Sequence, residues 1–118
     1  MFSVFRISIL SIVVSALFAT SSLAHKINVF AYAETGQVKT ESYFADGRPV
    51  KQSRVMVYDS NDNLLLEGKT DDEGLFSFAI PKVDDLKVVV REILGHRNSF
   101  ILKKSEIVAS KVTEKGNN

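Results

Sequence analysis

The chain has 118 residues and no cysteine, and its 15 basic and 14 acidic side chains give a formal net charge of +1. This length is enough for one small domain and too short for two ordinary ones. Without cysteines the domain cannot be held by disulfides or tethered as a lipoprotein, so it must depend on a packed core. A nearly neutral chain also argues against nucleic acid or an acidic surface as a partner, because both require a basic patch.

The first 24 residues are typical of a secretory signal peptide. A short segment with one positive charge, Arg6, is followed by the apolar run Ile7–Thr20 and then by the small residues of Ser22–Ala24. The alternative is a retained membrane anchor, because the uncharged stretch that ends at Ala24 is 18 residues long and is at the margin of a span. The small residues favour cleavage after Ala24. We therefore expect a periplasmic mature chain, residues 25–118, with a formal net charge of zero and no membrane span.

Seven short segments of the mature chain are rich in alternating apolar, β-branched and aromatic residues, and turn residues close each of them. In the first segment, Ile27 and Val29 share one face. We expect Phe30 and Tyr32, on the other face, to be buried as well, in a central strand or beneath the chain ends; an exposed aromatic stripe is the alternative. The seven segments are Lys26–Ala33, Val38–Ala45, Ser53–Asp59, Leu64–Lys69, Leu75–Ile80, Leu86–Glu92 and Asn98–Lys103.

Strands at spacings near ten residues, without any long helical period, predict an all-β fold: a seven-stranded antiparallel Greek-key β-sandwich. We expect the sandwich to cover residues 25–104 after the signal peptide of residues 1–24. Residues 105–118 are predicted to form a polar C-terminal tail, with one helical turn at Ser105–Ala109 and a frayed end.

Two acidic segments are better explained by turns than by ion binding. Asp59–Asn63 begins like an EF-hand loop but has Leu64 and Thr70 where that loop needs glycine and glutamate, so an Asx-type hairpin turn is expected. Asp71–Gly74 has the composition of a tight turn between strands. The chain also has no nucleophile elbow and no glycine-rich phosphate loop. We therefore do not expect an enzyme.

The two histidines, His25 and His96, are the strongest chemical signal. Cleavage after Ala24 would give His25 a free α-amine, and this amine and the Nδ1 atom of the ring could then chelate one metal ion. Neutral nitrogen ligands suit copper, nickel, cobalt or zinc. His96 lies in a predicted turn and is the candidate third ligand. If the first two strands pair so that Ala33 faces Val38, Asp46 lies opposite His25 and is a weaker candidate for a carboxylate ligand or for orienting a ligand.

At these same residues the chain resembles a known family. The segments His25–Tyr32, Thr40–Val50, Glu67–Gly74 and Gly95–Arg97 are similar to the small periplasmic accessory subunit of bacterial nickel/cobalt energy-coupling-factor transporters. Parts of them also resemble carboxypeptidase-regulatory-like, transthyretin-type sandwiches, which occur in many unrelated proteins and indicate fold more than function. The resemblance implies binding of a divalent metal through His25 and His96, beside the subunits of a membrane metal transporter.

Three functions remain open on the sequence. The first is an exported transition-metal-binding protein that assists nickel/cobalt uptake by a membrane transporter. The second is a periplasmic copper-binding or copper-handling protein with the same ligands, because the N-terminal histidine is also similar to that of periplasmic copper-binding sandwiches, and raw affinity favours copper. The third is a sandwich module for protein–protein contact, without metal. Members of the transporter family often carry a hydrophobic C-terminal span, whereas this C-terminus is polar, so a soluble metal-delivery protein is as well supported as an integral subunit.

Overall fold

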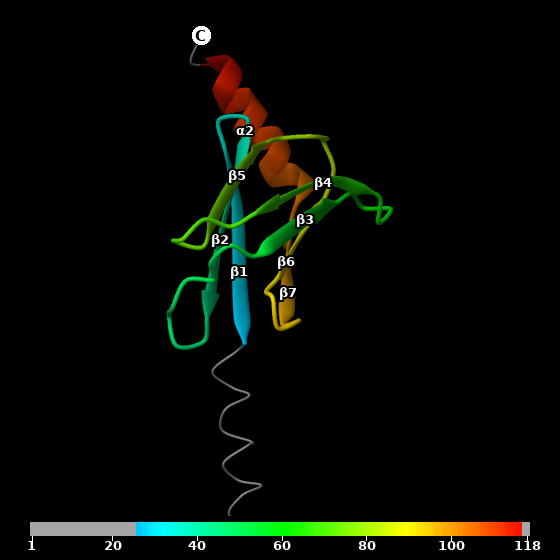
Figure 1. Ribbon diagram of the computed structural model, residues 1–118. Coiled ribbons are helices and arrows are strands. Elements are labelled where there is room, and N and C mark those ends of the chain that lie inside the picture. Colours follow the sequence, from blue (N-terminus) through cyan, green and yellow to red (C-terminus); the bar gives the residue numbers. More distant parts are fainter. Residues whose placement is uncertain (1–25, 117–118) are drawn as a thin grey trace, which may run out of the picture.

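The computed structural model describes residues 26–116, which form seven β-strands followed by one C-terminal helix (Figure 1). Every predicted strand is present, and each predicted boundary lies within one residue of the observed one. The predicted signal peptide and His25 lie outside the described residues. The elements are β1 (Ile27–Glu34), β2 (Gln37–Phe44), β3 (Arg54–Tyr58), β4 (Leu64–Lys69), β5 (Leu75–Ala79), β6 (Leu86–Arg91), β7 (Arg97–Leu102) and α2 (Lys104–Gly116).

The strands form two antiparallel sheets, with the orders β1-β2-β5 and β4-β3-β6-β7. Because β2 neighbours β5 and β3 neighbours β6, the chain crosses from one sheet to the other after β2, β4 and β5. In the β1–β2 hairpin Ala33 faces Val38 and Ile27 faces Phe44, which is the predicted register. The two layers confirm the predicted antiparallel sandwich.

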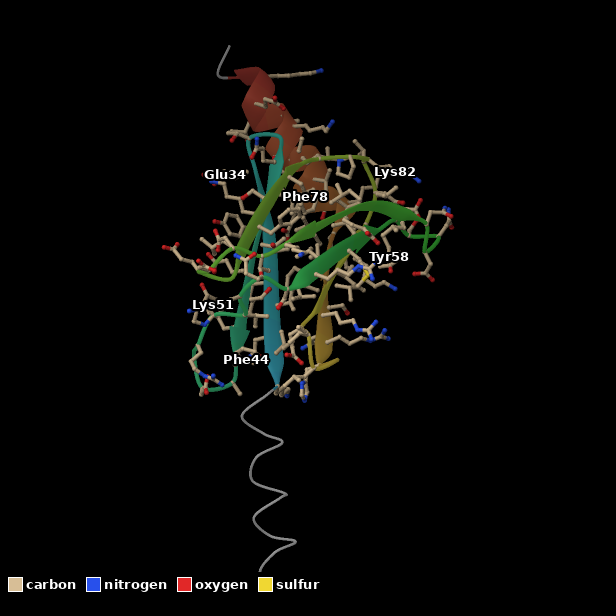
Figure 2. All side chains as sticks on the ribbon, viewed as in Figure 1. Glu34, Phe44, Lys51, Tyr58, Phe78 and Lys82 are labelled. Atoms are coloured by element: carbon tan, nitrogen blue, oxygen red, sulfur yellow. The ribbon has the colours of Figure 1, made fainter. Side chains whose placement is uncertain are left out.

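Alternate residues of the strands fill the space between the sheets. Val55 and Val57 of β3 point inward, as do Val88 and Val90 of β6, and all four are fully buried. Figure 2 shows Phe78 of β5 inside the molecule, facing this layer. Burial of each such side chain stabilises the fold by about 1.5–3 kcal/mol, so this layer supplies the packed core that a domain without disulfides requires.

The expectation that β1 is buried on both faces is wrong. β1 is an edge strand of the three-stranded sheet. Its inward residues Ile27, Val29 and Ala31 are buried, but Phe30 and Tyr32 on the other face are 53% and 43% exposed. Each sheet of a two-layer sandwich has its outer face in solvent, and the sequence pattern of β1 does not reveal which of its two apolar faces that is.

The prediction of a frayed tail after one helical turn is also wrong, because α2 continues to Gly116. Three contacts with distant residues explain the longer helix. Ile107 is fully buried against the sandwich. The hydroxyl oxygen of Ser110 accepts a hydrogen bond from the backbone N–H of Gly36 at 2.9 Å. The carboxylate of Asp85 accepts one from the first helical N–H, that of Lys104, at 2.7 Å and so caps the helix.

Both acidic segments form the predicted turns. Asp59 Oδ1 accepts hydrogen bonds from the backbone N–H groups of Asn61 and Asn63, both at 2.9 Å. Asp71 Oδ1 accepts them from Glu73 and Leu75 at 2.8 and 2.9 Å. These carboxylates therefore hold turns together.

One end of the sandwich matters most for function, and we call it the proximal end. It comprises the start of β1 at Lys26, the β2–β3 connection (residues 45–53) and the β6–β7 turn (residues 92–96), which lie together at the bottom of the view in Figure 1. Asn98, at the start of β7, donates a side-chain hydrogen bond to the carbonyl oxygen of Ile27 at 2.8 Å. The starts of the first and last strands are therefore side by side. Figure 2 shows Phe44 at this end, with Glu34 and Lys82 at the opposite, distal end.

Candidate functional site

The β6–β7 turn presents His96 at the proximal end. The backbone N–H of Glu92 donates to the carbonyl oxygen of His96, and that of Gly95 donates to the carbonyl oxygen of Glu92, both at 2.9 Å. Gly95 has a φ of +94°, a left-handed conformation that glycine adopts without strain. The turn therefore brings residues 92 and 96 to the same place at the base of the hairpin.

The side chains of Glu92 and His96 form a close pair. Nδ1 of His96 lies 2.6 Å from Oε1 of Glu92, and the backbone N–H of His96 donates to the same oxygen at 3.0 Å. The carboxylate is nearly enclosed, with 8% of the Glu92 side chain exposed, whereas the His96 side chain is partly open to solvent. A buried acceptor thus fixes the orientation of a reachable imidazole.

The charge of the Glu92 carboxylate determines which nitrogen of the His96 ring carries the proton in this pair. Burial acts against the charged carboxylate, but hydrogen bonds from the His96 ring and backbone and from the Leu94 backbone outweigh it, and the pKa of the Glu92 carboxyl lies below its usual range. Because an ionised carboxylate accepts hydrogen bonds and cannot donate one, Nδ1 carries the proton in this contact. In the neutral ring the lone pair is then on Nε2, the arrangement in which a carboxylate orients a metal-ligating histidine.

The register of the first two strands places Asp46 at the proximal end, where the described residues begin. The backbone N–H of Ala45 donates to the carbonyl oxygen of Lys26 at 2.8 Å, which extends the β1–β2 ladder by one pair beyond Ile27. Asp46 follows Ala45 at this end, and His25, which is joined covalently to Lys26, lies outside the described residues. The hydrogen bond between Asn98 and Ile27 ties the same point to the strand that begins directly after His96.

Asp46 is engaged in a contact within its own turn. Its Oδ1 accepts a hydrogen bond from the backbone N–H of Arg48 at 3.1 Å, and its Oδ2 pairs with Nε of Arg48 at 2.7 Å. The backbone bond and then the side-chain bond from Arg48 lower the pKa of the Asp46 carboxyl. The guanidinium also lies 5.1 Å from the ring centre of Phe44. Asp46 would have to exchange the Arg48 guanidinium for a metal ion, so its geometry favours a structural role in the turn.

A groove of about 530 Å³ separates the turn of Asp46 from the turn of His96. Glu92 and Ile93 line one side of it, and the other side is formed by the β2–β3 connection with Arg48 and Lys51. The two turns thus face each other across a solvent-filled space at the proximal end. Within the described part of the chain, no three His, Asp or Glu side chains converge as a metal ion requires.

Glu92 is the functional candidate that the sequence analysis missed. It was assigned to the end of a strand, with no role for its side chain. The available signal was the spacing Glu92-x-x-x-His96 around Gly95, because a turn closed by a glycine brings the first and fifth residues of such a segment together.

Comparison with known proteins shows one relative of unassigned function. No family model matches the chain, and no solved structure matches it. The chain is 31% identical over 99 residues to an uncharacterized protein of Haemophilus influenzae, an alignment that covers 81% of this chain and 62% of the relative. The chain thus spans less than two thirds of the length of that protein. Residues 26–116 contain no helix that is long and apolar enough to cross a membrane.

Proposed function

We propose that this protein is an exported transition-metal-binding protein that assists nickel or cobalt uptake by a membrane transporter. The observation that supports it most directly is the Glu92–His96 pair, in which a buried carboxylate 2.6 Å from Nδ1 orients the ring at the end of the sandwich where β1 begins. Histidine ligands of metal ions commonly have such a partner, which fixes the ring and increases its basicity.

In this proposal the metal ion is held by the α-amine and Nδ1 of His25 and by Nε2 of His96. Three neutral nitrogen ligands suit a late divalent transition metal and are a poor match for calcium or magnesium. Glu92 supplies the negative charge beside the third ligand without contacting the metal. Asp46 is at most a fourth, exchangeable ligand, because Arg48 competes for both of its oxygens.

A role in transport is supported by the exposure of the site and by the resemblance of residues 25–104 to transporter accessory subunits. A centre at the tip of a small sandwich, with a partly exposed histidine, can pass its ion to a second protein without unfolding. The divalent ion is cargo in this role. The same ligands would bind copper more tightly than nickel or cobalt. A copper-handling function is therefore the alternative, and the metal titration must distinguish it from a role in nickel or cobalt uptake.

The test is a calorimetric titration of Ni²⁺, Co²⁺ and Cu²⁺ into protein exported by a bacterial host, with the N-terminus determined by mass spectrometry. We expect a mature chain of residues 25–118 that binds one ion. A matched chain with one extra residue before His25 should lose most of its affinity, because its amine can no longer form the chelate with the His25 ring.

The outcomes separate the alternatives. Equal binding by both chains contradicts the chelate. If His96→Ala binds the metal ion as tightly as the parent, His96 is not the third ligand. Binding of Cu²⁺ alone supports the copper-handling function. If the mature protein binds none of the three ions, the remaining alternative is a sandwich module for protein–protein contact.

A further inference from the structure

Four cationic side chains form a row across the outer face of the four-stranded sheet. Arg54 of β3 lies opposite Lys69 of β4 and opposite Arg91 of β6, and Arg91 in turn lies opposite Arg97 of β7. All four side chains are exposed. Neighbouring strands are about 4.8 Å apart, so the row is about 14 Å long. We call these four residues the cationic row.

The row is only partly neutralised. Arg54 pairs with Glu67, but Lys69, Arg91 and Arg97 have no ion pair with any residue in the described part of the chain. Like charges on directly opposed strand positions destabilise a sheet. The nearly neutral composition of the whole chain disfavours an acidic partner. Four separate strands nevertheless bring their cations together, so the surface at the cationic row is locally basic.

Two exposed aliphatic side chains project beside the row. Ile93 and Leu94 form the tip of the β6–β7 turn and are 98% and 72% exposed. They follow Arg91 and precede Arg97, so both arms of the hairpin carry a cation just behind an apolar tip. Isolated exposed aliphatic residues are common, but an adjacent pair at a projecting tip flanked by cations is typical of an interaction site.

Two further cations, Arg48 and Lys51, lie in a groove beside the tip. Ile93 lines two grooves, one shared with Arg48 and Lys51 and the other with Arg54, Lys69 and Arg91. A third hollow of about 550 Å³ on the outer face is floored by Met56 and Val89 and includes Arg91 and Arg97 on its rim. Apart from the nearly buried Glu92, every charged side chain that shares these two grooves with Ile93 is a cation.

We propose that the proximal end docks on an anionic phospholipid surface, with Ile93 and Leu94 entering the edge of the acyl layer and the cationic row contacting headgroup phosphates. An apolar element with cations set just behind it matches the two layers of a membrane interface. A nucleic acid or an acidic protein would engage the cations but would leave the aliphatic pair unexplained. This proposal does not depend on metal binding.

The chain contains no cysteine, so a single introduced one can carry a fluorescent label. In the full chain we would label Leu94→Cys at the tip, or Asn61→Cys in the β3–β4 turn at the distal end, with an environment-sensitive dye. Vesicles of phosphatidylcholine alone are compared with vesicles that also contain phosphatidylglycerol, in chelator-treated buffer. Both vesicle types meet the same N-terminal segment, so the comparison isolates the lipid charge.

We expect a blue shift and a gain in intensity for the label at position 94 with anionic vesicles only, and no change for the label at position 61. The response should disappear when salt is raised from about 0.1 M to about 1 M, because the screening length falls from about 10 Å to about 3 Å. Arg91→Glu combined with Arg97→Glu should abolish it. Lys103→Glu combined with Lys104→Glu, the same charge change at the distal end, should leave it intact.

Thermal unfolding checks that the reversed variants fold. In the Arg91/Arg97 variant one like-charge contact replaces another at the facing positions 91 and 97, while the carboxylate at position 91 faces Arg54, so we expect little change in stability. The proposal is overturned by an equal response to neutral and anionic vesicles, by no response to either, or by a response that survives charge reversal of the row. A response to an oligonucleotide or to polyglutamate without one to vesicles assigns the row to an acidic macromolecule instead.

Discussion

One carboxylate oxygen of Glu92 receives two donors from His96, the ring Nδ1 at 2.6 Å and the backbone nitrogen at 3.0 Å. The same atom therefore sets both the conformation of the β6–β7 turn and the orientation of the imidazole. A change at Glu92 should thus affect the candidate metal centre without altering any proposed ligand.

We predict that Glu92→Gln lowers the affinity for Ni²⁺ or Co²⁺ by about 10–100-fold, the usual effect of removing a carboxylate behind a metal-ligating histidine. Competition with a chromophoric chelator measures the change. Glu67→Gln is the matched control, because Glu67 is exposed and its carboxylate pairs with Arg54. If the two variants bind equally tightly, Glu92 does not orient a ligand.

Asp59 should make the stability of the fold sensitive to acid. An ion pair with Lys82 at 2.8 Å and then hydrogen bonds from Asn63 hold the pKa of the Asp59 carboxyl well below its usual range. A group with a depressed folded-state pKa stabilises the fold in full above its unfolded pKa of about 3.9, and this contribution is lost as the pH falls toward the folded value.

The free energy of unfolding in urea should therefore fall more steeply from about pH 5 to about pH 2 in the parent than in Asp59→Asn. Asp62→Asn is the control from the same turn, because the Asp62 side chain is highly exposed. Parallel pH profiles for the parent and Asp59→Asn would show that this carboxylate contributes nothing to the acid sensitivity.

Helix α2 should be part of the cooperative fold. Ile107 is fully buried, so Ile107→Ala should reduce the free energy of unfolding by about 2–5 kcal/mol. Val112 lies five residues later on the exposed side of the helix, and Val112→Ala should change stability by less than about 0.5 kcal/mol. Urea denaturation measures both. Similar small effects of the two substitutions would mean that the helix is not coupled to the sandwich.

The strands were predictable because their signal is local. Alternating apolar residues and turn-forming segments located each strand to within one residue, and the β1–β2 register followed from the length of one hairpin. Helix α2 was missed because its segment has few apolar residues, and its supports, Asp85 and Gly36, are distant in the sequence.

The candidate site was predictable only in part, for a related reason. His25 and His96 stood out because the chain has just two histidines. The cationic row did not, since it depends on strand neighbours that only the folded topology defines, whereas Glu92 was signalled only by its local spacing from His96 in the β6–β7 turn. The exposure of Phe30 likewise follows from the two-layer fold, which leaves the outer face of β1 in solvent and which the residues of that strand do not encode.

Two glycines offer a further test of the turns. Gly74 has a φ of +78°, and an added Cβ would meet the backbone oxygen of Ser42, whereas Gly95, with a φ of +94°, has open space around it. Gly95→Ala should cost about 1–2 kcal/mol, from the left-handed conformation alone. Gly74→Ala should cost distinctly more, because β2 must also move. Comparable losses in thermal stability would contradict this difference.

The hydrogen bond between Asn98 and Ile27 joins residues that are 71 positions apart in the chain. Contacts of such high sequence separation close late, because a long loop must be ordered before they form. The start of β1 is made first during synthesis, yet its neighbour β7 is completed almost last. A metal centre built across this contact, as proposed above, would exist only after β7 has been made, so the ion would be captured by a nearly complete chain.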